Sequence, residues 1–119
     1  MNKINLLEKF DKFDDHWNPR IIGKLNGQAV KIAKLKGDFI WHDHKDEDEL
    51  FYVIKGKLSI EFRDKTIHLE SGEMLVVPRG IEHRPHCKEE VWLMLFEPET
   101  TKNTGDVISA ITKDRLEEI

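Results

Sequence analysis

The stretch from Gly37 to Gly56 reads GDFIWHDHKDEDELFYVIKG and carries most of the information about the fold and the site. His42 and His44 lie two residues apart, and residues i and i+2 of an extended chain point to the same face. The two imidazoles are therefore expected side by side, as two ligands of one metal ion must be. An acidic run at 46–49 leads into the apolar segment 50–54, which indicates two strands joined by an acidic turn.

Strand alternation selects one carboxylate from this acidic run. Glu49 shares a face with Phe51 and Val53, so if these two apolar side chains line the interior of a barrel, Glu49 points inward as well. The three acidic residues at 46–48 are then expected in the solvated turn. Glu49 is thus the carboxylate that the pattern places beside the histidine pair.

The region from 29 to 96 consists of short runs with period-two alternation, separated by turn residues. The clearest run is 57–63, in which apolar and polar side chains alternate, and it is followed by similar runs at 66–70 and 74–77. Strands of four to eight residues at regular intervals are typical of a sandwich or a barrel. We therefore expect an all-β domain.

The segment 91–96, VWLMLF, is apolar at every position. A strand with one solvated face cannot sustain such a pattern, so both of its faces must be covered. The cover could come from the terminal helices or from a second copy of the chain. This strand is the basis for predicting a homodimer.

Signals for helices and turns lie near the two ends of the chain. Apolar residues recur at helical spacing in 4–13, which predicts a short N-terminal helix. Asn26 and Gly27 predict a tight hairpin turn, since both central positions of a type I′ turn need a positive φ. Residues 112–119 predict a short C-terminal helix with Thr112 as its N-cap.

Two spaced motifs, separated by 15 residues, stand out: Gly37-x4-His42-x-His44-x4-Glu49-x6-Gly56 and Gly72-x5-Pro78-x-Gly80-x2-His83. They resemble the two motifs of the cupin superfamily. The first has one residue fewer than the usual five after its glycine, and the second agrees at every spacing up to the histidine. The resemblance extends over about 30–96.

This resemblance implies a fold and a cofactor. The implied fold is an all-β double-stranded β-helix, the cupin jelly-roll barrel, with short N- and C-terminal helices. One domain would span 1–119, with the barrel core at about 29–97. The implied cofactor is one divalent metal ion, and the residues carried over as its ligands are His42, His44, Glu49 and His83.

Nitrogen and oxygen donors of this kind suit Fe, Mn, Ni, Co, Cu or Zn without selecting one of them. The single cysteine, Cys87, excludes a thiolate-rich zinc site and an intramolecular disulfide. Cys87 stands where the family motif ends in asparagine. This difference leaves the four metal ligands intact, but the residues that contact a ligand in the pocket do not follow from the family motif. Cys87, Arg84 and His86 are the candidates for substrate binding, whereas Phe39 and Trp41 alternate with the histidine pair and are expected to face away from it.

Composition excludes two classes of partner. The net charge is −4, from 19 basic and 23 acidic residues, and no cluster of Lys and Arg forms the basic surface that nucleic-acid binding requires. The longest apolar stretch, 91–96, is far shorter than the roughly 20 residues that cross a bilayer. We therefore expect a cytoplasmic protein that binds neither nucleic acid nor a membrane, and whose partner is a small-molecule ligand.

Three classes of function remain open. The favoured one is a metal-dependent enzyme that acts on a small chelating or anionic metabolite, of the dioxygenase, lyase or isomerase type. A sugar-phosphate isomerase is one member of this class, and it is considered because the chain resembles the phosphomannose isomerase-like type of small cupin. Binding of a sugar phosphate calls for several basic residues at the pocket, and only Arg84 and Arg79 lie near the motifs. The second class is a small-molecule-binding or sensing cupin without catalysis, and the third is a protein whose metal is mainly structural.

Overall fold

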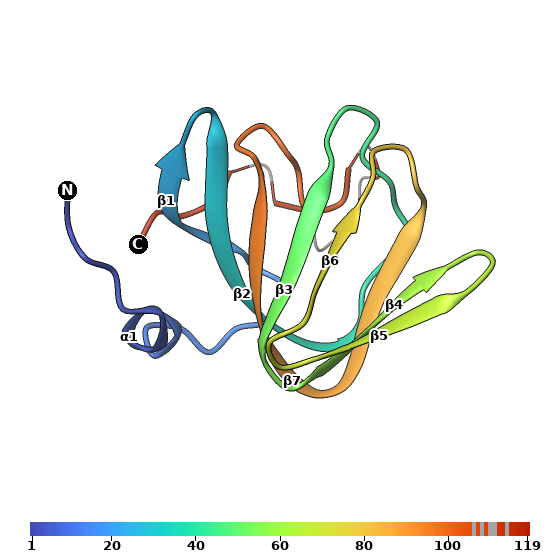
Figure 1. Ribbon diagram of the computed structural model, residues 1–119, viewed down its shortest axis with the longest axis horizontal. Coiled ribbons are helices and arrows are strands. Elements are labelled where there is room, and N and C mark those ends of the chain that lie inside the picture. The colour runs from blue at the N-terminus through green and yellow to red at the C-terminus, as the bar shows by residue number, and fades with distance from the viewer. Residues whose placement is uncertain (106, 108, 110–111, 114) are drawn as a thin grey trace.

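In the part of the chain that the structure describes, seven antiparallel strands form a sheet that folds around one interior, and one short helix lies near the N-terminus (Figure 1). The computed structural model describes residues 1–105, 107, 109, 112–113 and 115–119. The elements are α1 (Leu6–Phe10), β1 (Arg20–Leu25), β2 (Gln28–Asp38), β3 (Glu49–Lys55), β4 (Lys57–Phe62), β5 (Thr66–Glu70), β6 (Met74–Val77) and β7 (His83–Pro98). The expected all-β jelly-roll architecture is confirmed.

The long strand β7 connects the two parts of the sheet. Its first residues, from His83 to His86, pair with β4, and its second half, from Trp92 to Phe96, pairs with both β2 and β3. The strand order β1-β2-β7-β3-β6 makes one layer, and β4 pairs with β5 and β7 to continue the sheet. Residues at odd positions of β7 point inward in both halves, as their burial pattern shows.

The interior is packed with apolar side chains from alternate positions of the strands, as the sequence pattern predicts. The largest cluster contains Phe51 and Val53 from β3, Leu58 and Ile60 from β4, and Leu93 from β7, together with seven further buried residues. Because Phe51 and Val53 lie inside, the alternation of β3 turns the side chain of Glu49 inward as well.

The N-terminal segment covers part of the outer face of β7. The ring of Phe10 at the end of α1 stacks on Trp92, with 4.8 Å between the ring centroids, and Met94 packs against the same cluster. The side chain of Asn5 caps α1 by accepting a hydrogen bond from the Glu8 N–H at 3.0 Å. This helix therefore accounts for one part of the second apolar face of 91–96.

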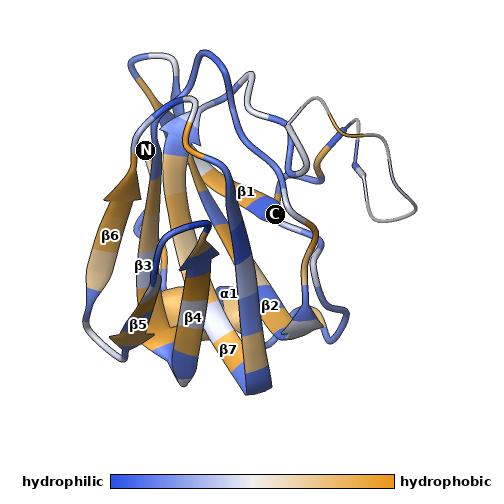
Figure 2. Ribbon diagram, turned by 90° about the vertical axis from the view of Figure 1, so that its right-hand side faces the viewer, coloured by the Kyte–Doolittle hydropathy of each residue, from blue (hydrophilic) through white to orange (hydrophobic). Residues whose placement is uncertain are grey.

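The other part of this outer face lies on β3 and on the edge strand β6. Figure 2 shows β6 as a largely hydrophobic strand at the margin of the molecule. Met74 and Val76 on β6 are 51% and 47% exposed, and they lie opposite Tyr52 and Leu50 of β3.

The predicted C-terminal helix over 112–119 is wrong. None of the described residues in this segment is helical, and Glu118 forms a parallel bridge with Ile21 of β1. The Ile119 N–H donates to the carbonyl oxygen of Ile21 at 3.0 Å, so backbone bonds to a strand take the place of helical ones. Positions 114 and 110–111 lie outside the described residues.

The turns agree with the sequence-based predictions better than the C-terminal segment does. Asn26 and Gly27 have φ angles of 50° and 75°, and Leu25 pairs with Gln28 across the predicted two-residue turn. Gly56 between β3 and β4 has φ +99°, and a Cβ added there would meet the Glu90 carbonyl oxygen at 2.8 Å. Among the described residues, no helix has the length and apolar character needed to cross a bilayer.

Candidate metal centre

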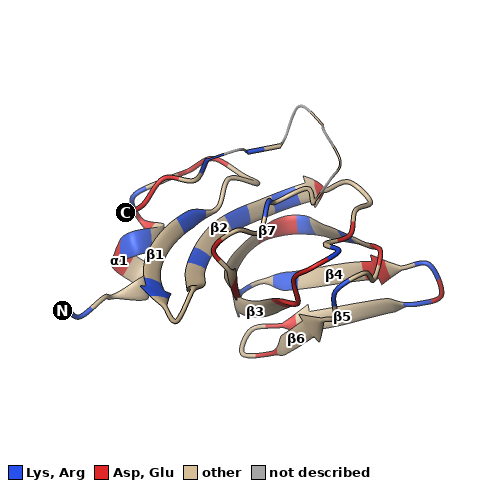
Figure 3. Cartoon of the chain, turned by 90° about the horizontal axis from the view of Figure 1, so that it is seen from above, with Lys and Arg blue, Asp and Glu red and all other residues tan. Residues whose placement is uncertain are grey.

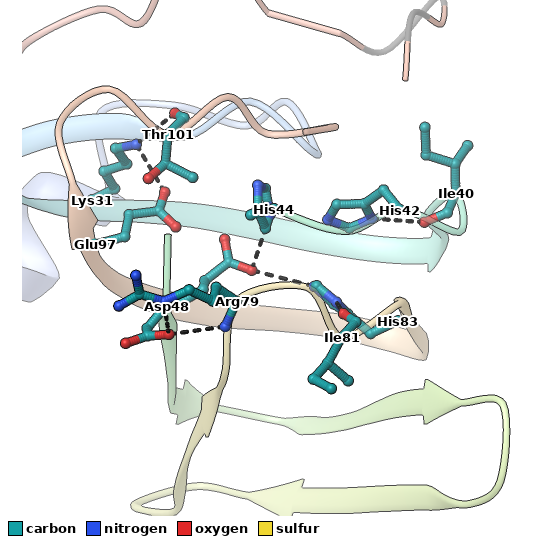
Figure 4. Close-up of polar contacts among 11 residues, drawn as sticks. Lys31, Ile40, His42, His44, Asp48, Arg79, Ile81, His83, Glu97 and Thr101 are labelled. Carbon is teal, nitrogen blue, oxygen red and sulfur yellow. Dashed lines mark hydrogen bonds and ion pairs between the residues drawn. The ribbon is translucent and has the colours of Figure 1, made fainter. Parts of the chain in front are cut away.

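The structure brings together the four residues of the motifs as one buried group (Figure 4). Each can offer one donor atom, and these atoms all lie within 4.8 Å of one another. They come from three places in the fold: His42 and His44 from the loop between β2 and β3, Glu49 from the start of β3, and His83 from the start of β7. Two strands and one loop thus meet at one end of the barrel.

Backbone carbonyl groups set the orientation of two of the imidazoles. Nδ1 of His42 lies 2.9 Å from the carbonyl oxygen of Ile40, and Nδ1 of His83 lies 2.8 Å from that of Ile81. A carbonyl oxygen only accepts, so each Nδ1 carries the hydrogen. The lone pair is then on Nε2 of each ring, which is the arrangement that metal-binding histidines use.

The atoms inside the group are mostly acceptors that face each other. Oε1 of Glu49 lies 3.3 Å from Nε2 of His83 and 3.5 Å from Nε2 of His44. His44 is buried, and neither of its ring nitrogens has a hydrogen-bond partner among the described residues. Buried polar atoms without a partner are costly and rare. A divalent cation among these atoms would bind one ring nitrogen of His44 together with one donor atom from each of the other three residues, so the donor set fits a metal ion of the kind that binds nitrogen and oxygen.

Burial and charge shift the pKa values of these groups in different directions. Burial lowers the pKa of His42 to about 4, with a further contribution from His83, so this imidazole is neutral near pH 7. Burial also acts to lower the pKa of His44, but the nearby Glu49 carboxylate raises it above the ordinary value. Burial acts to raise the pKa of Glu49, yet the neighbouring side chains of Glu97, His44 and His83 hold it well below the usual range.

A pocket opens beside the donor group. His42, Glu49, Glu97 and Asn103 supply polar groups to its lining, and the remaining walls are apolar or aromatic, among them Trp17, Phe39, Phe51, Pro85, Leu93 and Leu95. The Trp17 and Phe39 rings stack with 4.8 Å between their centroids. Trp17 has φ +59°, a left-handed backbone conformation that is rare for a bulky residue and is found at functional sites.

The expectation that Phe39 faces away from the histidine pair is wrong. Its ring lies edge-on to that of His42, with 5.2 Å between the centroids, and it lines the pocket. Strand β2 ends at Asp38, so strict alternation does not extend to position 39. Trp41, in contrast, lies beneath the guanidinium of Arg63 at 3.8 Å and does not line the pocket.

The three candidates for substrate binding lie apart from this pocket. Arg84 and His86 both contact the carboxylate of Glu61 on β4, at 3.0 Å and 2.9 Å. Cys87 is buried within the apolar core, and burial raises the pKa of its thiol to about 11. None of the three is among the residues described as lining the pocket, and their role in binding stays a prediction.

Sequence reasoning did not identify Lys31, Glu97 and Trp17. Lys31 lies within an apolar strand and Glu97 directly follows the apolar run 91–96, so their charges mark a break in the pattern. Figure 3 shows basic residues along β2, most of which would be read as solvated. In the sequence, a charged residue at an inward position of a strand is the signal that its side chain is buried and paired.

Comparison with known proteins adds to this geometry. Residues 30–97 match the family described as Cupin domain, Cupin_2. The crystal structure of a cupin-2 domain containing protein from Shewanella frigidimarina is 48% identical, with a TM-score of 0.80, and the match covers 81% of this chain and 94% of that one.

Two curated relatives are similar over part of their length. The uncharacterized protein YdbB of Bacillus subtilis is 42% identical over 64 residues, which are 53% of this chain and 57% of that protein. Acireductone dioxygenase of Yarrowia lipolytica is 30% identical over 105 residues, which are 81% of this chain and 60% of that enzyme. The chain thus spans less than two thirds of either relative.

The family match includes both motifs and all four residues of the donor group. It runs from Val30 on β2 to Glu97 on β7, which is more than half of the chain. The antiparallel barrel and the buried histidine and glutamate side chains agree with this match. The chain therefore belongs to the cupin superfamily.

Proposed function

We propose that this cupin is a metal-dependent enzyme that acts on a small chelating metabolite, with dioxygenase chemistry favoured over lyase or isomerase chemistry. The observation that carries the proposal is the position of His42 and Glu49, which belong to the buried donor group and also line the adjoining pocket. A small molecule in this pocket would lie next to the ion. The similarity to an acireductone dioxygenase over 81% of the chain supports the same class of reaction.

One set of residues would bind the ion, and another would bind the substrate. His42, His44, Glu49 and His83 would hold one divalent ion and leave it with a net local charge of about +1. The ion would supply Lewis acidity and open coordination positions for a chelating group. The aromatic and aliphatic walls near Trp17 and Phe39 would exclude water and bind the apolar part of the substrate.

The composition of the pocket bears on the alternatives. A sugar-phosphate isomerase of the phosphomannose isomerase-like type needs basic side chains that converge on a phosphate, and no Lys or Arg is among the described residues that line this pocket. That assignment is therefore less well supported. A binding or sensing role remains the main alternative, since the same pocket would serve a ligand that is bound without turnover. A mainly structural metal would not require a pocket beside it.

Metal content and turnover test the proposal. Purified protein is expected to hold close to one transition-metal ion per chain, or to take it up after loading with Fe, Mn, Ni, Co, Cu or Zn, as measured by elemental analysis. The loaded protein is then supplied with acireductones, diketones, catechols, thiols and sugar phosphates, with and without oxygen. Oxygen-dependent turnover supports the proposal, and tight binding without turnover supports the sensing alternative. Metal uptake far below one ion per chain contradicts both.

A further inference from the structure

The pocket beside the donor group is small and largely apolar. Its volume is about 40 Å³, whereas one water molecule needs roughly 10–15 Å³ on the same scale. A group of only a few heavy atoms therefore fits inside it. Apart from His42, Glu49, Glu97 and Asn103, its walls are apolar or aromatic. Since two of these four belong to the donor group, a ligand here has a metal-binding end and an apolar surrounding for the rest.

The lining offers no partner for a second anionic group on a ligand. No Lys or Arg is among the described residues that line the pocket. Lys31 contacts the lining through Glu97, but it is only 1% exposed. Its Nζ donates to Oε1 of Glu97 at 2.8 Å and to the carbonyl oxygen of Thr101 at 3.2 Å (Figure 4). Because a charge buried without a partner is costly, the pocket disfavours a ligand whose tail carries a carboxylate or a phosphate.

Trp17 supplies one wall of this pocket from outside both sequence motifs. It lies in the segment between α1 and β1. Its ring stacks on that of Phe39, with 4.8 Å between the centroids, and the Phe39 ring lies edge-on to His42 at 5.2 Å. Two ring contacts thus connect Trp17 to a residue of the donor group. A change in the size of the Trp17 side chain would change the space next to the metal ion.

Hydrogen bonds to β2 hold Trp17 in a backbone conformation that does not suit its bulk. The Trp17 N–H donates to the carbonyl oxygen of Lys34 at 2.9 Å, and Nε1 donates to that of Lys36 at 2.8 Å. The φ angle of +59° is one that glycine adopts readily and a large side chain adopts at a cost. The backbone by itself therefore favours glycine here. The contribution of tryptophan at this position lies in its side chain, which closes the pocket.

We propose that Trp17 is a specificity-determining residue, and that the pocket selects a small chelating substrate with a short, uncharged tail. The metal ion would bind the chelating end, and the Trp17 ring would limit the size of the tail. The proposal rests on the proposed function of the donor group. It narrows the chelating or anionic metabolites expected from the sequence to chelators without a second anionic group.

A matched pair of hydroxamic acids tests the charge of the tail. Butanohydroxamic acid and succinic monohydroxamic acid have the same chain, but a carboxylate replaces the terminal methyl group in the second compound. Their dissociation constants are measured with the Co²⁺-loaded protein from its visible absorption spectrum. We expect about 10–100-fold weaker binding of the compound with the carboxylate, because no cation in the lining pairs with it. Equal affinities for the two compounds would overturn the proposal.

Two substitutions at position 17 test the size of the tail. Trp17→Gly removes the ring and suits the left-handed backbone, whereas Trp17→Phe keeps a smaller ring. Trp41→Ala is the matched control, since Trp41 does not line the pocket. The quantity compared is the dissociation constant of benzohydroxamic acid divided by that of acetohydroxamic acid, again with Co²⁺-loaded protein.

This ratio separates a specificity role from a merely structural one. We expect it to fall about 10-fold or more in Trp17→Gly, to fall less in Trp17→Phe, and to stay constant in Trp41→Ala. The Co²⁺ dissociation constant should be the same in all variants. A structural role of Trp17 would weaken both compounds alike and leave the ratio constant. A constant ratio in both Trp17 variants, or an equal fall in Trp41→Ala, would overturn the proposal.

A measurement on the metal-free protein separates this proposal from the proposed function. Each of the three tryptophans gives one indole N–H signal in a nitrogen–proton NMR spectrum, and the signal of Trp17 is identified by its loss in Trp17→Phe. Butanohydroxamic acid should shift this signal at lower concentrations than succinic monohydroxamic acid does. An equal response to both compounds would overturn the proposal even if the protein binds Co²⁺. The expected response in a protein that fails to bind Co²⁺ would refute the metal function alone.

Discussion

The backbones of His42 and His83 are hydrogen-bonded to each other in both directions. The His42 N–H donates to the carbonyl oxygen of His83 at 3.0 Å, and the His83 N–H donates to that of His42 at 2.9 Å. This bridge joins the loop of the first motif to the beginning of β7 without using either imidazole. The two ligands are therefore held together by the fold, and an ion would bind to a site that already exists.

Replacing His83 with alanine should remove metal binding and leave the barrel folded. The substitution deletes one donor, whereas the backbone bridge to His42 remains. We expect the affinity to fall by more than the roughly 10–100-fold seen for residues that only support a ligand. Elemental analysis and far-ultraviolet circular dichroism measure the two effects. His68→Ala, on the outer face of β5, serves as the control, and an unchanged metal stoichiometry in His83→Ala would contradict the assignment.

Metal affinity should depend on pH through His44. The pKa of His44 is raised by Glu49 against the effect of burial, so a proton must leave this imidazole before it can bind a metal. Co²⁺ binding is expected to weaken by up to about tenfold per pH unit once the pH lies below the pKa of His44. Protonation of His42 does not weaken Co²⁺ binding further until about pH 4, because burial lowers the pKa of this imidazole to that value.

Calorimetry in two buffers with different ionisation enthalpies measures this proton release directly. The observed enthalpy of Co²⁺ binding should change with the buffer at mildly acidic pH. Identical enthalpies in the two buffers would mean that no proton is displaced, contrary to the raised pKa of His44.

The turn glycines should differ in their tolerance of alanine. Gly56→Ala places a Cβ at 2.8 Å from the Glu90 carbonyl oxygen in a left-handed conformation, and we expect a loss of roughly 2–4 kcal/mol in the free energy of unfolding. Gly37→Ala has φ +82° but no heavy atom within 4 Å of its Cβ, so a loss of about 1 kcal/mol is expected. Urea unfolding of both variants compares them, and equal losses would contradict the role of the close contact.

Cys87 should be unreactive in the folded protein. Its thiol is buried, and burial raises its pKa to about 11, so very little thiolate is present at neutral pH. Ellman's reagent is expected to label one thiol per chain in concentrated guanidinium chloride and almost none under native conditions. Rapid labelling of the native protein would show that Cys87 is accessible, as its proposed contact with a substrate would require.

The homodimer predicted from the sequence remains to be tested in solution. Phe10 and α1 cover the outer face near Trp92, so the exposed apolar area that could bind a second copy is centred on the edge strand β6. Light scattering should give twice the mass of one chain, and Met74→Asp combined with Val76→Asp should reduce it to that of one chain. A wild-type mass equal to one chain contradicts the prediction.

Alternation in the sequence was informative wherever the backbone is a regular strand. Alternation places Glu49 correctly on the inner face because β3 begins at this residue and runs without a break past Phe51. It misplaces Phe39 because β2 ends one residue earlier. It does not reveal the role of Glu97, because burial of this charge depends on Lys31, which is 66 positions away in the sequence and adjacent only after folding.

The two predicted helices, over 4–13 and 112–119, also show that a local sequence pattern does not decide the structure alone. The spacing of apolar residues in 4–13 correctly predicted a helix, although only Leu6–Phe10 is helical. The segment 112–119, with Thr112 as its N-cap, predicts a second helix, but the backbone of Ile119 pairs with Ile21 instead. A short helix is marginal by itself, so tertiary contacts decide between these outcomes.

Strand β7 carries His83 at its first position and Glu97 near its last, with both side chains on the inner face. Deleting or inserting a single residue between them would invert one of the two relative to the barrel. The length of β7 is therefore fixed by the chemistry at its two ends. The turn between β4 and β5, at 63–65, carries none of the four donor residues, so a change in chain length there should leave the donor group unaltered.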